Sequence, residues 1–321
     1  MSKILITGIT GFIGGELAHR FYRSHEVHGI VKPSRSRDYS SLEDIENNIT
    51  LHELDISDYA AVVNLFDRLQ PEIIIHLAAL SPVRASFDNP FDYIRVNVDG
   101  TVNIVEALQK LPNPNERRLV FASTAEVYGL QDECVPFTED MRLEPSSPYA
   151  CTKVFADTYI RMKHEVQGLN CTIMRCVNTF GRKYDKSFFI EYLIDQMLND
   201  RDIHIGAPNS IRDYMWVEDH LNAYELAITK EEARGEIFNA ATGNGVSNLQ
   251  AASLLAELAG YDKNRIHTDS YPIDYPTRPL ASDQPYLVLS ASKIKRKLGW
   301  PEPLDLNTSL ARALDYWRIQ K

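Results

Sequence analysis

The sequence is poor in cysteine, has no long apolar run and carries no excess of basic charge. Four of its 321 residues are cysteines. They form no Cys-x-x-Cys pair and lie near no histidine cluster, so we expect reduced thiols and no metal. No run of about 18 apolar residues occurs, and the chain passes from Met1 almost directly into an apolar segment, which predicts a cytoplasmic protein without a membrane span. The formal net charge of −10 disfavours nucleic acid and anionic membranes as partners.

Short apolar segments alternate with helical patterns over the first half of the chain. An apolar run at 4–6, a glycine turn, a helical pattern at 12–23 and a second apolar run at 26–31 predict a βαβ unit. Further strand-like runs lie at 50–54, 72–77, 118–122 and 171–175, and helical patterns lie at 60–69, 97–111 and 150–165. This alternation predicts an α/β fold, a Rossmann-like doubly wound parallel sheet covered on both faces.

The rest of the chain is less regular. Helical patterns lie at 188–198, 217–229, 248–258 and 306–316, and strand candidates lie at 202–205 and 236–240. We predict a smaller C-terminal α/β lobe that binds substrate, made of about 181–210 and 242–321. Residues 1–180 and about 211–241 would form the cofactor-binding domain.

Three glycines follow the first predicted strand, with the spacing Gly8-x-x-Gly11-x-x-Gly14. Gly8 permits a tight turn, Gly11 lets the backbone approach a pyrophosphate, and Gly14 lets the helix pack closely on the strand. The N-terminus of the next helix offers N–H groups and a partial positive charge to phosphates. The pattern indicates a dinucleotide site, and its predicted contacts are Gly8, Thr10, Gly11, Phe12, Ile13 and Gly14.

The residues after the second strand indicate which dinucleotide binds. NAD usually meets a carboxylate on its ribose 2′-hydroxyl, whereas NADP meets a basic group on its 2′-phosphate. Residues 31–37 contain no carboxylate, so NADP is predicted and NAD is the second choice. The predicted contacts are Lys32, Ser34 and Arg35. Asp55 and Ile56 end the third strand and are placed to meet the adenine, although Asp55 is also a typical turn residue.

Tyr149 and Lys153 lie four residues apart in a helical pattern, so their side chains rise from one face. A tyrosine has a pKa of about 10, and a nearby ammonium lowers that pKa, so the pair is interpreted as a base. Thr124 and Glu126 directly follow an apolar strand, where ligands bind in open parallel sheets. We expect Thr124 to hold the substrate hydroxyl that Tyr149 deprotonates.

With these residues, the chain resembles the extended short-chain dehydrogenase/reductase family, and within it the nucleotide-sugar epimerases and dehydratases. The motifs that carry the resemblance are Thr7-Gly8-x-x-Gly11-x-x-Gly14, His76-Leu77-Ala78-Ala79, Ser123-Thr124-Ala125-Glu126-Val127-Tyr128-Gly129, Tyr149-x-x-x-Lys153, Asn178-Thr179-Phe180-Gly181, Arg212-Asp213-Tyr214 and Arg278-Pro279. The resemblance spans nearly the whole chain.

The resemblance implies further contacts and a homodimer. Lys153 would also bind the nicotinamide ribose, and Leu77, Ala78 and Ala79 would line the cofactor. The residues expected at a nucleotide-diphosphate sugar are Ser81, Arg84, Asn178, Arg212 and Arg278. Helices at 97–111 and 150–165 would pair with their copies in a second subunit.

The reaction expected from this resemblance begins with oxidation at the sugar C4. A 4-ketone acidifies the C5 proton, so Glu126 is placed to remove it while the 6-hydroxyl leaves, after which hydride returns to C6. The Ser-Thr-x-Glu arrangement and the segment 27–31 most resemble GDP-mannose 4,6-dehydratases, which favours a lyase acting on a GDP-sugar. Ala125 departs from the aspartate of the dTDP-glucose type. A 4-epimerase, a 4-keto-sugar reductase, a sugar-acid decarboxylase and a non-catalytic NADP-binding regulator remain alternatives.

Overall fold

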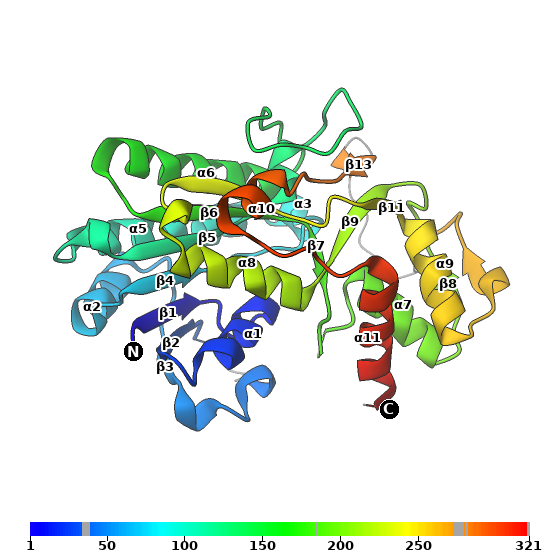
Figure 1. Ribbon diagram of the computed structural model, residues 1–321, viewed down its shortest axis with the longest axis horizontal. Coiled ribbons are helices and arrows are strands. Elements are labelled where there is room, and N and C mark those ends of the chain that lie inside the picture. The colour runs from blue at the N-terminus through cyan, green and yellow to red at the C-terminus, as the bar shows by residue number, and fades with distance from the viewer. Residues whose placement is uncertain (34–38, 184, 272–278, 280–281, 320–321) are drawn as a thin grey trace.

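A seven-stranded, wholly parallel sheet forms the larger part of the molecule (Figure 1). The computed structural model describes residues 1–33, 39–183, 185–271, 279 and 282–319. In spatial order the strands are β10 (Glu236–Ala240), β6 (Cys171–Cys176), β5 (Arg118–Thr124), β4 (Ile73–His76), β1 (Lys3–Thr7), β2 (Glu26–Val31) and β3 (Thr50–Glu53). The chain order reverses between β1 and β4, which is where open α/β sheets bind ligands.

Helices cover both faces of this sheet because its strands are apolar on both sides. Ile4 and Ile6 of β1 pack in one buried cluster, and Leu5 between them packs in another. The first cluster includes residues of α1 (Phe12–Phe21), α8 (Val217–Thr229) and α10 (Ser292–Leu298). The second includes residues of α2 (Tyr59–Leu69), α5 (Gly100–Lys110) and α6 (Pro148–Gln167). The predicted doubly wound Rossmann-like fold is therefore confirmed.

The start of α6 sets the position of the candidate catalytic pair. The Ser147 hydroxyl accepts a hydrogen bond from the Ala150 amide at 3.1 Å, and Pro148 follows as the first helical residue, which together form an N-terminal cap. The helix begins two residues earlier than the predicted 150–165. Tyr149 therefore lies inside the first turn, one turn before Lys153.

In the part of the chain that the structure describes, the smaller part of the molecule contains a four-stranded sheet, a strand pair and the helices α7 (Phe189–Leu198), α9 (Asn248–Ala259) and α11 (Leu306–Ile319). Strand β9 (Ile211–Trp216) pairs with β7 (Asn178–Phe180), β11 (Gly245–Ser247) and β13 (Tyr286–Leu287). Beside this sheet, α7, α9 and α11 share a core with β8 (Ile203–His204), which pairs with β12 (Ile266–His267). Because β10 lies in the large sheet and β9 in the small one, segment 211–241 contributes to both sheets. The domain division at about residues 180, 211 and 241 stays a prediction.

The short elements between β4 and α5 are α3 (Ala85–Asp88), α4 (Pro90–Tyr93) and the π-helical η3 (Ile94–Asp99). The single helix predicted at 97–111 therefore begins in a π-helical turn. Among the described residues, no helix is long and apolar enough to cross a membrane, and no group of three or more potential ligands could hold a metal ion.

A buried ion pair joins β6 to α6. Arg175 and Asp157 are both 0% exposed, and the guanidinium donates to both carboxylate oxygens, at 2.9 and 3.1 Å. A third guanidinium nitrogen donates to the Tyr128 hydroxyl at 3.0 Å. Each of these polar groups would be costly to bury without the others.

Asp157→Ala is expected to lower the free energy of unfolding by about 3–5 kcal/mol, because it leaves the Arg175 charge buried and unpaired. Urea denaturation measures this change. The control is Glu257→Ala, which removes the exposed ion pair with Lys263 and should cost at most about 1 kcal/mol. An equal loss of unfolding free energy in the two variants would show that the buried pair stabilises the fold no more than an exposed pair.

Candidate active site

The glycine turn after β1 forms a cradle that side chains would block. Gly8 has a φ of +72°, and a Cβ placed on it would lie 2.9 Å from the Ala78 amide nitrogen. A Cβ on Gly14 would lie 2.2 Å from the Gly8 carbonyl oxygen. No side chain caps the N-terminus of α1 at Gly11. Backbone N–H groups are thus available to phosphate oxygens, and the turn fits a dinucleotide pyrophosphate.

Gly14→Ala is expected to weaken dinucleotide binding by about tenfold or more and to lower stability by about 1–3 kcal/mol, because the added methyl overlaps the Gly8 carbonyl. The matched control is Gly15→Ala, the next position of α1, where the nearest atom to an added Cβ is the Ser41 hydroxyl at 3.4 Å. Titration with NADP and NAD and thermal unfolding measure both effects. Similar affinities in the two variants would rule out steric control at Gly14.

A series of buried hydrogen bonds fixes Leu77 and Ala78, the residues after β4 that face the glycine turn. The Leu77 and Ala78 amides donate to the Thr7 hydroxyl oxygen at 3.2 and 3.0 Å. The same hydroxyl contacts His76 Nδ1 at 2.7 Å, and His76 Nε2 contacts the Thr101 hydroxyl at 3.0 Å. Burial lowers the pKa of His76 to about 3, so the imidazole stays neutral and serves as a structural bridge.

The other predicted cofactor residues lie at the same edge of the sheet. The Thr10 carbonyl accepts a hydrogen bond from the Ser41 hydroxyl at 3.5 Å. Phe12 lies under the Arg182 guanidinium, 4.5 Å from ring centre to Cζ, and Ile13 packs against the core. Ala79 is half-buried just after Ala78.

At the adenine end, the structure gives Asp55 a turn role. One Asp55 carboxylate oxygen accepts from the Ser57 amide at 2.9 Å and from the Ser57 hydroxyl at 2.7 Å, and the other oxygen pairs with Arg95 at 3.3 Å. Ile56 is buried against Gly100. Lys32 is exposed after β2. The predicted contacts Ser34 and Arg35 lie outside the described residues.

Thr124, Glu126 and Tyr149 come together where β5 ends. Thr124 is the last residue of β5, and its hydroxyl accepts from the Glu126 amide at 3.2 Å, which starts the short helix η5 (Ala125–Tyr128). The Tyr149 side chain forms a hydrogen bond with Thr124. The Tyr149 ring meets Tyr93 edge-on, with ring centres 6.4 Å apart. Two hydroxyl groups and a carboxylate therefore share one site.

The charge state of the catalytic pair differs from the sequence-based expectation. Burial raises the pKa of the Tyr149 phenol well above its usual value, and the hydrogen bond to Thr124 offsets only part of that rise. The expected lowering by Lys153 is wrong for this structure, because Lys153 Nζ donates to the Ala122 carbonyl at 2.8 Å and lies 4.8 Å from the Phe121 ring centre. Burial lowers the pKa of Lys153 to about 8, which leaves it mostly protonated at neutral pH.

The predicted substrate residues are spread over several elements. Ser81 and Asn178 are exposed, and Arg84 lies over the Tyr271 ring at 5.3 Å. Arg212 in β9 is 9% exposed and pairs with Asp283 at 3.1 Å. Arg278 lies outside the described residues. A diphosphate that binds Arg212 would therefore compete with a carboxylate already in place.

Several residues at this site were missed from the sequence. Asn97 of η3 accepts from the Leu80 amide at 2.8 Å and donates to the Leu80 carbonyl and the Thr152 hydroxyl, both at 3.0 Å, which ties the loop after β4 to α6. The Gln284 side chain donates to Glu126 at 3.0 Å. The sequence signal for Asn97 is a polar residue on the buried side of a helical pattern, whereas Gln284 sits in a proline-rich loop that carries no signal.

A buried neutral pair lies beside Thr124 in the sheet. Cys176, the register partner of Thr124, has its sulfur 2.8 Å from His220 Nε2. The other nitrogen of His220 contacts the Thr179 hydroxyl at 2.9 Å. Burial raises the pKa of the Cys176 thiol to about 12 and lowers that of His220 to about 3, so neither group is charged at neutral pH.

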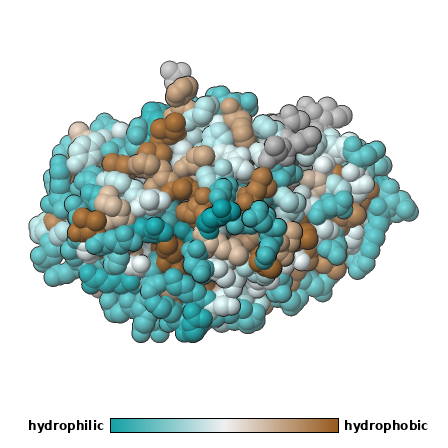
Figure 2. Space-filling model, turned by 90° about the horizontal axis from the view of Figure 1, so that it is seen from above, coloured by the Kyte–Doolittle hydropathy of each residue, from teal (hydrophilic) through white to brown (hydrophobic). Residues whose placement is uncertain are grey.

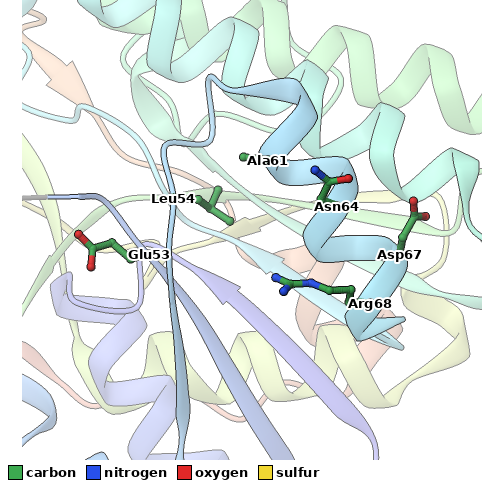
Figure 3. A pocket seen from close by; sticks show the side chains of 6 residues that line it. All are labelled: Glu53, Leu54, Ala61, Asn64, Asp67 and Arg68. Carbon is green, nitrogen blue, oxygen red and sulfur yellow. The ribbon is translucent and has the colours of Figure 1, made fainter.

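A surface hollow of about 510 Å³ lies between the end of β3 and α2 (Figure 3). Its lining residues are Glu53, Leu54, Ala61, Asn64, Asp67 and Arg68. None of them is a candidate catalytic or cofactor residue. The chemistry is therefore assigned to the edge of the sheet where β1, β4 and β5 end.

The sequence of this chain matches one protein-family model over most of its length. The family model described as GDP-mannose 4,6 dehydratase matches residues 5–312. The chain belongs to this family. The predicted resemblance to the nucleotide-sugar epimerases and dehydratases is confirmed.

Curated relatives cover almost the whole chain. The dTDP-glucose 4,6-dehydratase of Salmonella typhimurium is 31% identical over 337 residues, which cover 99% of this chain and 92% of the relative. The enzyme of the same name from Escherichia coli is 30% identical over 343 residues, covering 99% and 94%. Family membership therefore extends over both parts of the molecule.

Solved structures share the fold over the same length. The UDP-glucose 4-epimerase of Thermotoga maritima, solved with UDP-glucose, has a TM-score of 0.85 at 27% identity and covers 99% of both chains. The UDP-glucose 4-epimerase of Thermus thermophilus, solved with NAD, has a TM-score of 0.85 at 25% identity, covering 98% of this chain and 99% of its own. The dTDP-glucose 4,6-dehydratase of Streptomyces venezuelae, at 24% identity and a TM-score of 0.86, has the same fold.

Proposed function

We propose that this chain is a nucleotide-sugar 4,6-dehydratase that works through a transient 4-keto sugar. The observation that carries the proposal is the Glu126 carboxylate beside the hydrogen-bonded Thr124 and Tyr149 hydroxyls. Oxidation at C4 needs only the hydroxyl groups and a base, whereas loss of water needs a carboxylate aimed at C5. The curated relatives named as dTDP-glucose 4,6-dehydratases support the same reaction.

Oxidation at C4 is assigned to Thr124, Tyr149 and Lys153. Thr124 holds the 4-hydroxyl, and the Tyr149 phenolate takes its proton as the C4–H bond breaks. A nicotinamide cofactor held by the glycine turn from Gly8 to Gly14 would supply the hydride acceptor for C4 and the hydride donor for C6. Burial raises the pKa of Tyr149. Lys153 Nζ, which donates to the Ala122 carbonyl in this structure, would therefore have to turn toward the phenol to favour the phenolate.

Elimination is assigned to Glu126. The carboxylate removes the C5 proton, the C5=C6 double bond forms, and the 6-hydroxyl leaves with a proton as water. Ala125 has no acidic side chain, so Glu126 also delivers that proton to the leaving hydroxyl. C5 then takes a proton from solvent through the same carboxyl as C6 is reduced, and the net change is the loss of one water.

A product-mass panel tests this function. The protein is incubated with GDP-mannose, UDP-glucose, UDP-glucuronate and dTDP-glucose, and product masses are recorded. Loss of water from one sugar supports the dehydratase, and loss of carbon dioxide indicates a decarboxylase. A product of unchanged mass with inverted configuration at C4 would instead favour a 4-epimerase, the activity named for two of the structural neighbours.

NADP is proposed as the cofactor, with NAD as the second choice. No carboxylate occurs in residues 31–37, and Lys32 is exposed where β2 ends. Lys32→Ala is expected to weaken the binding of NADP by about tenfold, because one charge-assisted contact to the 2′-phosphate is lost. The affinity for NAD should stay unchanged. Titration of both cofactors measures this. Tighter binding of NAD than of NADP by the unaltered chain would contradict the proposal.

A GDP-sugar substrate, a cytoplasmic location and a homodimer complete the proposal. The outer side of α6 supports the dimer, because Phe155, Met162 and Val166 are 45%, 38% and 72% exposed. Figure 2 looks onto the side that is uppermost in Figure 1, where apolar side chains gather between polar ones. Light scattering should give a mass twice the chain mass of 36.5 kDa. The Val166→Glu variant should have the mass of a single chain.

A further inference from the structure

Gln284 is a buried amide that reaches the candidate general base from a distant part of the chain. It is 1% exposed, and its Nε2 donates to the Glu126 carboxylate at 3.0 Å and to the Ser146 hydroxyl oxygen at 3.4 Å. The two residues Gln284 and Glu126 are 158 positions apart in sequence. This contact therefore joins the segment before β13 to the short helix after β5.

The orientation of this amide follows from the chemistry of its partner. An ionised carboxylate can only accept hydrogen bonds, so the NH₂ group of Gln284, not its oxygen, must face Glu126. Both N–H bonds of the amide are then used, by Glu126 and Ser146. The amide oxygen is left buried with no hydrogen-bond partner among the described residues. A buried acceptor of this kind calls for a donor that the described residues do not provide.

Hydrogen bonds and an ion pair fix the residues just before Gln284. The Ser146 hydroxyl donates to the Ser282 carbonyl at 3.2 Å, and the Ser282 hydroxyl donates to the Pro279 carbonyl at 2.6 Å. Asp283 pairs with Arg212 at 3.1 Å. Gln284 is thus held between the candidate base and an arginine that is a candidate diphosphate contact.

We propose that Gln284 is a positioning residue for the elimination step, which rests on the proposed dehydratase function. Its N–H group holds the Glu126 carboxylate in place, and its amide oxygen accepts a hydrogen bond from a hydroxyl of the bound sugar. The first contact orients the base toward the C5 proton, and the second fixes the sugar relative to that base. Oxidation at C4 depends on Thr124 and Tyr149, whereas the hydrogen bonds of Gln284 go to Glu126 and Ser146.

The test separates the two half-reactions in single turnover, with a nucleotide sugar that the unaltered chain dehydrates. Absorbance of the reduced nicotinamide follows C4 oxidation, and product mass follows loss of water. Gln284→Met keeps the length of the side chain and removes both polar groups. It is expected to leave the rate of cofactor reduction within about threefold, to slow water loss by about tenfold or more, and to raise KM severalfold. Reduced cofactor should therefore accumulate.

Gln284→Glu separates the two contacts and covers the case in which the Met variant does not fold. It keeps an oxygen for the sugar but places a second carboxyl group against Glu126, and two such groups share a proton. Water loss should slow as in the Met variant while KM stays near that of the unaltered chain. The control is Ser282→Ala, which removes a hydrogen bond within the same segment and should leave both half-reactions unchanged.

Three outcomes overturn the proposal. Water loss at the unaltered rate in both Gln284 variants would mean that the contact has no role in elimination. Equal slowing of oxidation and water loss would mean that Gln284 only maintains the fold or binds substrate. A slow Ser282→Ala variant would assign the effect to the segment as a whole. Failure of the unaltered chain to lose water from any sugar would instead overturn the proposed function itself.

Discussion

Tyr149→Phe is expected to lower kcat about 10³-fold, because the substitution removes the group that takes the proton from the C4 hydroxyl. The phenol is buried beside Thr124, so water cannot easily replace it. Cofactor affinity should change little, since the ring remains in place. Single-turnover absorbance of the reduced nicotinamide measures the step directly, and none should form on the timescale of the unaltered chain.

Tyr159→Phe is the matched control for this prediction. It removes a phenol hydroxyl from the same helix, where Tyr159 bonds to Glu106 on α5 and not to the site. Turnover should stay within about twofold of the unaltered chain. Normal turnover in Tyr149→Phe would mean that another group takes the proton, and the assignment of the catalytic pair would be wrong.

Glu126→Gln is expected to stop the reaction after oxidation. The amide cannot take the C5 proton, so water loss should fall about 10²–10⁴-fold, whereas reduction of the cofactor should proceed. The enzyme would then hold reduced cofactor and 4-keto sugar together. Mass spectrometry of the quenched mixture and the absorbance of the reduced nicotinamide measure the two quantities.

An alternative role for Glu126 predicts a different result. If the carboxylate only stabilises the turn after β5, the isosteric amide should keep most of that role and water loss should continue. Glu144→Gln is the control, because its carboxylate is exposed and pairs with Arg142. Equal rates in the two variants would identify Glu126 as structural.

The large sheet was predictable because its strands are buried on both faces. The runs 26–31 and 236–240 are mostly apolar because helices on both faces of the sheet exclude water from them, and β2 and β10 have those bounds. The small sheet was not predictable. Strand β9 contains the charged residues Arg212 and Asp213. Its partners β7, β11 and β13 are two or three residues long, which is too short to show the alternation of apolar and polar residues that indicates a strand.

The candidate site was predictable where it lies at strand ends and helix starts. Gly8, Thr124 and Tyr149 each follow a pattern that fixes their place in a parallel sheet. Charge states were not predictable, because burial raises the pKa of Tyr149 and the Lys153 ammonium donates to the Ala122 carbonyl. Gln284 was beyond sequence reasoning, since only the folded chain brings it to Glu126.

Transfer of a deuterium label tests the internal return of hydride most directly. A nucleotide sugar that the chain dehydrates is prepared with deuterium at C4 and converted in ordinary water with a catalytic amount of protein. We expect the product to have lost water and to carry the deuterium at C6, because the hydride that leaves C4 returns within one site. Deuterium retained at C4, or lost to solvent, would contradict this mechanism.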